Sequence, residues 1–139
     1  MNNEDFVTLK QSKILKKMGF DWECDYIYAI FDLNEHLVSK SEFYGACLYK
    51  LCDDHYFAPT IYQAMKWMRE EMGIDIVISP KFNSNTGDRV GYFWRWSQRT
   101  DVNMNPKTHK TYEKAVLDAI DTIISPFEEL YNTDKSYEG

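Results

Sequence analysis

A switch in apolar periodicity at Gly73 constrains the fold of this chain more than any other feature. Before Gly73, apolar residues recur every three or four positions, which predicts one face of a helix: Ile61, Ala64, Met65, Met68 and Met72. Pro59 biases the residue before it away from the helical region, and Thr60 with Gln63 forms a capping-box pattern, so the helix is expected to begin there. After Gly73 the run at 74–78 alternates with a period of two, so a strand follows the helix directly.

This strand is predicted to form a hairpin with residues 89–98, across the turn-forming cluster at 83–88. Each strand puts three large apolar residues on one face: Ile74, Ile76 and Ile78 on the first, and Tyr92, Trp94 and Trp96 on the second. The two sets are buried together only if opposed residues share a face. We therefore expect both indoles to lie in the core.

Charge selects one register among those that keep these faces. The expected register places Asp75 opposite Arg95, which is a matched cross-strand charge pair. The same register sets Ile76 against Trp94 on the core side. A shift of two residues in either direction loses the charge pair, and a bulge at Gly87 would produce such a shift.

Two more helices are predicted on either side of this segment. Thr8 and Gln11 form a capping box at the start of a helix that ends at Gly19. Thr111 precedes a last helix, after a loop that contains Pro106 and is expected at residues 101–109. The lysine-bearing first helix and the last helix then cover a sheet together with the helix before Gly73.

A second pair of strands is expected between the first two helices. Tyr26–Phe31 is rich in aromatic and β-branched residues and predicts a strand. Residues 46–51 carry a weaker strand pattern. The polar stretch at 32–41 predicts a loop or a short irregular insert, with a short helix somewhere in 35–45 as the alternative.

The expected order of elements is α-β-β-α-β-β-α. This order predicts an α+β fold, with a largely antiparallel sheet of about four strands in two hairpins covered by three main helices. Ser125 and Pro126 predict a kink or a second short helix near the carboxyl end. We expect one domain over residues 1–139, with a loose tail at 132–139.

Composition and charge exclude several protein classes. With 44% hydrophobic and 27% charged residues, the chain is a globular protein rather than a disordered one. Its net charge of −6 argues against a general nucleic-acid or membrane-surface binder. The first residues lack the apolar segment of a signal peptide, and no apolar run approaches the ~18 residues of a spanning helix. The odd count of 3 cysteines indicates free thiols, so we expect a cytoplasmic protein without membrane contact.

Two stretches nevertheless concentrate cations. Four lysines and no acid lie between Thr8 and Met18: Lys10, Lys13, Lys16 and Lys17. Residues 93–99 interleave aromatic side chains with arginines, as platforms for single-stranded nucleic acid do. We favour the simpler explanation that each stretch is the solvated face of an amphipathic element. If an anion binds here, the contacting residues are expected to be Lys10, Lys13, Lys17, Arg95 and Arg99.

One set of residues has the donor types of a zinc site: Cys47, Cys52 and His55, with Cys24 as a conceivable fourth ligand. The spacing lacks the close cysteine pair that makes such sites recognisable. Cys47 also lies in an apolar stretch, where a free cysteine acts as a small hydrophobic residue. We therefore expect no bound metal.

The sequence contains no recognisable catalytic motif. The three histidines are scattered along the chain: His36, His55 and His109. Asp53, Asp54 and His55 form either an acid/base group or a polar turn before the next helix. The glycines are isolated, so neither a P-loop nor a dinucleotide-binding motif is present. We expect a protein that is not an enzyme and uses no cofactor.

The segment APTIYQAMKWMRE at 58–70, with the Met-Gly and isoleucine-rich strand after it, resembles a family of small uncharacterised proteins encoded by phages and integrated mobile elements of gut anaerobes. The first helix with Gly19-Phe20-Asp21 and Cys24 is similar, as is the late helix that begins Tyr112-Glu113-Lys114-Ala115. These motifs are structural, so the resemblance implies an accessory protein of a phage or mobile element and no particular reaction.

Two functional hypotheses follow from these observations. The first is a non-enzymatic accessory or interaction protein whose partner is another protein. The second is a nucleic-acid-associated protein of a mobile element, which would use the lysine-rich first helix and the Arg/Trp strand. The net negative charge favours the first hypothesis.

Overall fold

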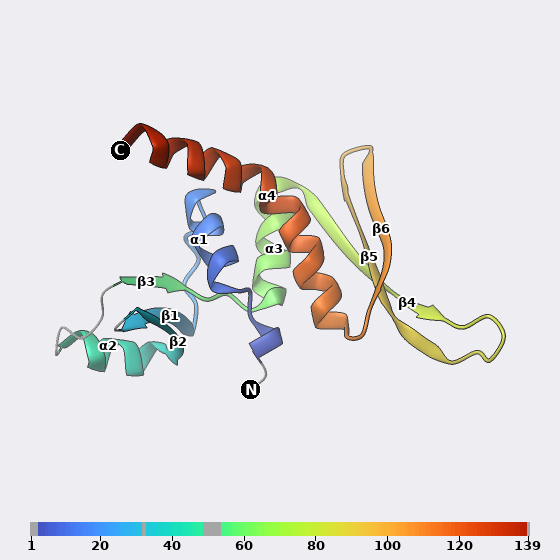
Figure 1. Cartoon of the computed structure of the whole chain (residues 1–139), viewed down its shortest axis with the longest axis horizontal. Helices are drawn as coiled ribbons and strands as arrows, with labels where there is room; N and C mark the ends of the chain where they lie inside the picture. Colours follow the sequence, from blue (N-terminus) through green and yellow to red (C-terminus); the bar gives the residue numbers. More distant parts are fainter. Residues whose placement is uncertain (1–2, 32, 49–53, 139) are drawn as a thin grey trace. The chain divides into compact units, whose positions relative to one another are not determined.

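The computed structural model of the chain describes residues 3–31, 33–48 and 54–138 (Figure 1). Packing divides the chain into two compact units. Unit 1 comprises residues 1–5 and 61–123, and unit 2 comprises residues 6–60 and 124–139.

The described elements confirm the α+β class but correct its details. They form two three-stranded antiparallel sheets, where about four strands in one sheet were expected. Four α-helices occur in the described part of the chain, where three main helices were expected. None of the helices in that part is long and apolar enough to cross a membrane.

In unit 2, helix α1 spans Leu9–Lys17 and has the capping box that the sequence predicts. The Thr8 hydroxyl accepts from the Gln11 amide at 3.1 Å, and the Gln11 side chain accepts from the Thr8 amide at 2.9 Å. Gly19, with a φ of 103°, ends the helix. The Phe20 amide then donates to the Leu15 carbonyl at 2.9 Å, which folds the buried Phe20 ring back towards α1.

The sheet of unit 2 has the order β2-β1-β3. Its central strand β1, Tyr26–Phe31, confirms the prediction, and it pairs with β2, Asn34–Ser39, and with β3, Asp54–Phe57. The predictions for both edge strands were wrong, since they made 32–41 a loop and placed a polar turn before Pro59. Their polar residues fit edge positions, where one side of the strand faces solvent.

The alternative of a short helix within 35–45 is confirmed in part by helix α2, Lys40–Leu48. Residues 46–48, expected in a strand, belong to the same helix. The rest of that expected strand, residues 49–51, lies outside the described residues. The reason for the error is a helix N-cap at Ser39 that the strand interpretation overlooked. The Ser39 hydroxyl accepts from the Glu42 amide at 3.3 Å and donates to the Glu42 carboxylate at 3.1 Å, which starts a helix here.

A small buried cluster ties the start of unit 2 to its sheet. Phe6, Tyr28 and Ala58 pack together, and the Tyr28 hydroxyl donates to the Val7 carbonyl at 2.6 Å. The Val7 amide in turn donates to the Pro59 carbonyl at 3.1 Å. These contacts fix β1 and the end of β3 beside the segment that leads into α1.

In unit 1, helix α3 spans Ile61–Met72 and strand β4 spans Ile74–Phe82, so the predicted switch at Gly73 is confirmed. Gly73 has a φ of 67°, a conformation that favours glycine. The buried face of α3 differs from the predicted one, because Trp67, which is not part of the predicted apolar face, is only 4% exposed. The four fully buried positions are Ile61, Ala64, Trp67 and Met68. A face centred on Ala64 includes the large indole and leaves Met65 and Met72 half-buried.

Strand β5, Arg89–Gln98, pairs with β4, which confirms the hairpin and corrects its register by two residues. Asp75 lies opposite Ser97, and Arg95 lies opposite Val77, so the expected charge pair is absent from the ladder. The predicted faces are retained: Ile74 and Trp94 are each 3% exposed, whereas Asp75 and Arg95 are exposed.

The turn explains the shift in register. The Asn83 amide donates to the Asp88 carbonyl, and the Gly87 amide donates to the Asn83 carbonyl, each at 2.8 Å. The ladder then pairs Phe82 with Arg89 and Lys81 with Gly91, so one residue of β5 is left over as a bulge. Without that bulge at 90, the strand faces would be inverted.

Residues 101–109 form a third strand, β6, Asp101–His109, and the expectation of a loop was wrong. Proline argued against a strand, yet Pro106 lies where the β5–β6 register shifts, a position that tolerates the missing amide. Gly91, with a φ of 155°, permits the close approach of β6. An added Cβ there would lie 2.4 Å from the His109 carbonyl oxygen.

Helix α4 spans Tyr112–Glu138 as one helical element with Pro126 inside it, so the expected second helix start at Ser125 is not seen. Thr111 caps its first turn, as predicted, by accepting from the Lys114 amide at 3.1 Å. Glu4, in the short 3-10 turn Asn3–Asp5, accepts from the Thr111 hydroxyl at 3.3 Å.

Candidate functional site

The lysines of α1 gather around one aromatic ring in unit 2. Lys13 Nζ lies 5.5 Å and Lys16 Nζ 5.0 Å from the centroid of the Tyr56 ring. The two lysines are three positions apart on α1, so their side chains lie on the same side of the helix. Both distances fall in the range of cation–π attraction. Edge strand β3 therefore presents its tyrosine to the basic face of α1.

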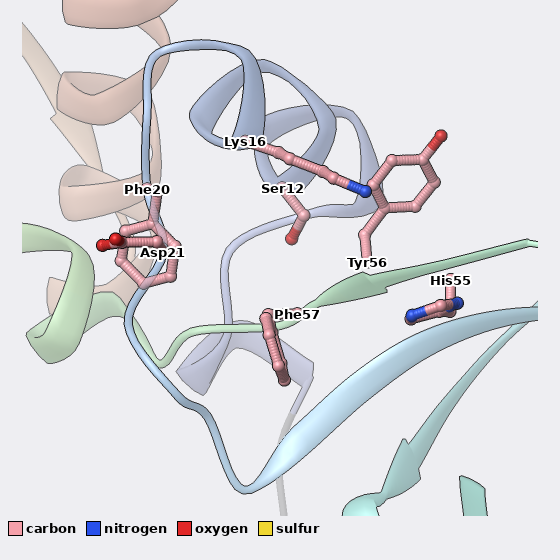
Figure 2. Close-up of a pocket in the computed structure, with 7 residues that line it drawn as sticks. All are labelled: Ser12, Lys16, Phe20, Asp21, His55, Tyr56 and Phe57. Carbon is pink, nitrogen blue, oxygen red and sulfur yellow. The ribbon is translucent and has the colours of Figure 1, made fainter.

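Two adjoining hollows surround this contact. One, of about 390 Å³, is lined by Lys13, Lys16, Lys17 and Tyr56, and we call it the lysine–tyrosine hollow. The other, of about 240 Å³, is the aromatic pocket (Figure 2), and it is lined by Ser12, Lys16, Phe20, Asp21, His55, Tyr56 and Phe57. Lys16 and Tyr56 line both, so the two hollows lie side by side.

Local sequence explains how the pocket is built. The turn at Gly19 brings Phe20 and Asp21 back beside α1. In β3, successive side chains point to opposite sides, and Figure 2 shows Tyr56 on the α1 side of the strand and Phe57 directed away from it. Phe57 remains 37% exposed, which is a large value for a phenylalanine.

A buried hydroxyl in the aromatic pocket is unsatisfied. Ser12 is only 3% exposed, and its Oγ has no hydrogen-bond partner among the described residues. Figure 2 shows this hydroxyl directed from α1 towards β3. A buried polar group usually has a partner, so the Ser12 hydroxyl indicates a missing one.

The predicted cation residues fall into separate groups. Lys13 and Lys17 line the lysine–tyrosine hollow with Lys16, whereas Lys10 pairs with Glu128 at 2.9 Å. These lysines belong to unit 2, and the predicted arginines belong to unit 1.

Neither arginine lies in a basic cluster. Arg95 lies in the middle of its sheet, opposite Val77 on β4 and Met104 on β6. Arg99, with a φ of 57°, occupies the turn between β5 and β6. There it lines a largely polar hollow with Met72, Gly73, Gln98 and Asp101.

The tryptophans of β5 are not available as a stacking platform. The Trp94 indole donates from Nε1 to Asp118 Oδ2 at 2.7 Å, and His109 Nε2 lies 3.1 Å from the same oxygen. Trp96 is only half-buried, although the sequence predicts both indoles in the core, and its indole nitrogen is buried without a hydrogen-bond partner among the described residues. The Trp94 indole, with its hydrogen bond to Asp118, therefore stabilises unit 1 and does not face a ligand.

Only some of the candidate zinc ligands lie in the part of the chain that the structure describes. Burial, with the nearby Asp25 carboxylate, raises the pKa of the Cys24 thiol to about 11, which disfavours the thiolate that a metal requires. Cys52 and the Cys47 side chain lie outside the described residues. Within the described part, no three or more His, Cys, Asp or Glu side chains are placed to hold a metal ion.

The structure places two of the three histidines and part of the Asp-Asp-His cluster on the edge strands of unit 2. His36 and His55 lie on the edge strands β2 and β3, each opposite Ala29 of β1. The His55 ring also packs 4.6 Å from the Phe43 ring, centroid to centroid. Asp54 begins β3, and Asp53 lies outside the described residues.

Sequence reasoning found Lys13 and Lys17 of the site but missed Lys16, which lines both hollows, and the other walls. Ser12, Phe20, Tyr56 and Phe57 were not predicted to contribute to binding. A usable signal existed in the adjacent aromatic residues Tyr56 and Phe57, shortly before Pro59, because a proline next to a strand-forming pair is typical of an edge strand. Comparison with known proteins gave no match: no family model, no curated protein and no solved structure matches this chain.

Proposed function

We propose that the protein is a non-enzymatic interaction protein that binds an acidic segment of a partner protein in the lysine–tyrosine hollow. The observation that carries the proposal is the convergence of Lys13 and Lys16 over the half-buried Tyr56 ring. The resemblance of residues 58–70 to phage and mobile-element proteins supports an accessory role in such an element.

The charge of these lysines is not neutralised inside the described structure. Lys10 has a carboxylate partner, but no carboxylate among the described residues pairs with Lys13 or Lys16. Cations concentrated in a hollow with aromatic walls attract anions and raise their local concentration. The hollow therefore complements carboxylates carried on a flexible segment.

A protein partner fits the rest of the molecule better than a nucleic acid does. The net charge of −6 repels a long polyanion away from the hollow, whereas a short acidic segment touches only the basic patch. Nucleic-acid binding stays the second candidate, because lysines beside an exposed aromatic ring also suit a phosphate chain with a stacked base.

The test compares two matched triple variants. Lys13→Ala, Lys16→Ala and Lys17→Ala together remove the basic wall of the hollow. Lys81→Ala, Lys107→Ala and Lys110→Ala remove the same charge from exposed positions in unit 1. Fluorescence anisotropy would follow the binding of a labelled Glu/Tyr copolymer and of a labelled single-stranded oligonucleotide to each protein.

We expect the wild-type protein and the unit 1 variant to bind the acidic polymer with similar affinity. The hollow variant should bind it at least tenfold more weakly, which corresponds to about 1.4 kcal/mol. Equal loss in both variants would show a non-specific charge effect and contradict the proposal. Tight binding of the oligonucleotide with no binding of the acidic polymer would favour the second candidate.

A further inference from the structure

The size of the aromatic pocket restricts what can occupy it. Its volume is about 240 Å³, below the roughly 300–1,000 Å³ of pockets that hold drug-sized ligands. A pocket of this size accepts one ring system. Its walls include the rings of Phe20, Tyr56 and Phe57, so an aromatic occupant is favoured.

The Ser12 hydroxyl favours an aromatic occupant whose ring carries a hydrogen-bonding atom. Ser12 is only 3% exposed, and its Oγ has no hydrogen-bond partner among the described residues. A hydroxyl can donate one hydrogen bond and accept two, so it suits a phenol or an indole N–H. Phenylalanine would fill the pocket and leave the hydroxyl without a partner.

The lysine–tyrosine hollow is the expected location for acidic groups of the same ligand. Lys16 and Tyr56 line both the hollow and the pocket, so a ring in the pocket lies next to the ammonium groups. Figure 2 shows the Lys16 ammonium beside Tyr56 and Asp21 towards the other end of the pocket. The carboxylates of a bound segment therefore belong on the Tyr56 side, away from Asp21.

We propose that the aromatic pocket receives a single tyrosine or tryptophan side chain of an acidic peptide segment whose carboxylates occupy the adjoining lysine–tyrosine hollow. This inference rests on the proposed function, since it names the anchor of the partner that the hollow binds. One buried aromatic anchor with neighbouring charges is a common arrangement at the centre of protein interfaces.

The test uses four labelled peptides of identical length and net charge, each with three glutamates next to one variable position: tyrosine, tryptophan, phenylalanine or alanine. Their affinities for the full-length protein are measured by fluorescence anisotropy. The tyrosine and tryptophan peptides should bind roughly tenfold or more tightly than the alanine peptide. The affinity of the phenylalanine peptide should lie between that of the alanine peptide and those of the tyrosine and tryptophan peptides.

Two variants test the pocket itself. Ser12→Ala should lower the affinity for the tyrosine peptide by about three- to tenfold and leave the affinity for the phenylalanine peptide unchanged, because only the phenol forms a hydrogen bond with the Ser12 hydroxyl. Phe57→Ala, at a partly exposed wall position, should weaken every aromatic peptide and spare the alanine peptide. Circular dichroism confirms that each variant is folded.

The outcomes separate this inference from the proposed function. If all four peptides bind wild type equally, and the hollow variant abolishes that binding, the proposed function stands and the anchor inference is wrong. If none of the peptides binds, the proposed function itself is overturned. Direct binding of a labelled oligonucleotide that carries an unpaired base, with no binding of any peptide, would assign the pocket to a nucleobase and overturn both.

Discussion

Two aromatic–polar contacts, one in each unit, differ in how completely their polar groups are satisfied. In unit 1 the buried Trp94 indole donates to Asp118, which also contacts His109. In unit 2 two ammonium groups lie over the half-buried Tyr56, and the Ser12 hydroxyl beside them has no partner in the described chain. Satisfied buried polar groups stabilise one structure, whereas unsatisfied ones at a surface hollow leave hydrogen bonds for a ligand. We therefore assign Trp94 a structural role and Tyr56 a binding role.

We call the Trp94–Asp118 contact of unit 1 the closed contact and the lysine–Tyr56 contact of unit 2 the open contact. The largest loss of stability is expected for a substitution at the closed contact. Trp94→Ala should lower the free energy of unfolding by about 3–5 kcal/mol, because it removes a buried indole and leaves a cavity. Tyr56→Ala, at the open contact, should change it by less than about 1 kcal/mol. Urea unfolding followed by circular dichroism measures both values. Equal losses in the two variants would erase the distinction between the contacts.

The carboxylate that closes the unit 1 contact should have a smaller effect. Asp118→Ala leaves the Trp94 indole N–H without its acceptor and should cost about 1–3 kcal/mol of unfolding free energy. Asp75→Ala removes an exposed carboxylate from β4 and should lie within about 0.5 kcal/mol of wild type. The same urea titrations apply, and a neutral Asp118→Ala variant would mean that the hydrogen bond is dispensable.

The buried phenol of Tyr28 makes unit 2 sensitive to alkaline pH. Burial, with the nearby Glu35 carboxylate, raises the pKa of Tyr28 to about 12, above the usual value near 10. Because the folded state disfavours the phenolate, this contribution to stability is complete below pH ~10 and is lost as pH rises to about 12. Wild type should therefore lose stability over that interval.

Tyr28→Phe should lose about 0.5–1.5 kcal/mol at neutral pH, since the hydrogen bond to Val7 is removed. The variant should also show a weaker decline between pH 10 and 12 than wild type. Tyr44→Phe, at an exposed position of α2, is the control. Urea midpoints at a series of pH values provide the measurement, and parallel curves for Tyr28→Phe and wild type would contradict the pKa shift.

The smallest effect on stability is expected at the open contact. Ser12→Ala removes an unsatisfied buried hydroxyl, so the unfolding free energy should stay level or rise slightly. Ser41→Ala, an exposed position on α2, serves as the reference. If Ser12→Ala lowers the unfolding free energy by more than about 1 kcal/mol, the hydroxyl has a hydrogen-bond partner within the protein and is not available to a ligand.

Local signals in the sequence predicted the framework of the fold well. The capping box at Thr8, the break at Gly73 and the hairpin faces follow from short-range chemistry, and the structure confirms each. The register failed because a charge pair worth ~0.2–1 kcal/mol cannot outweigh a turn closed by Asn83 and Asp88 with a bulge behind it. Strand β6 was missed because Pro106 was treated as a loop signal, although an irregular position in an edge strand accommodates it.

The candidate site was predicted only on its helical side. Lysines without intervening acids are visible in the sequence, so Lys13 and Lys17 were identified as binding candidates. Their aromatic partner was not, because Tyr56 reaches the lysines only once β3 has paired with β1, and Lys16 and Tyr56 are about 40 residues apart in the chain. Long-range pairing of this kind leaves no periodic signal near the lysines.

The central claim is that ligand binding occurs at the open contact of unit 2 and not at the tryptophans of unit 1. Titration of isotopically labelled full-length protein with the acidic tyrosine peptide, followed by amide and indole NMR resonances, tests it directly. We predict the largest shifts in α1 at Ser12, Lys13 and Lys16 and in β3 at Tyr56 and Phe57, with the Trp94 indole resonance unchanged. Shifts centred on the Trp94 and Trp96 indoles and on Arg95, with α1 and β3 unaffected, would contradict the account.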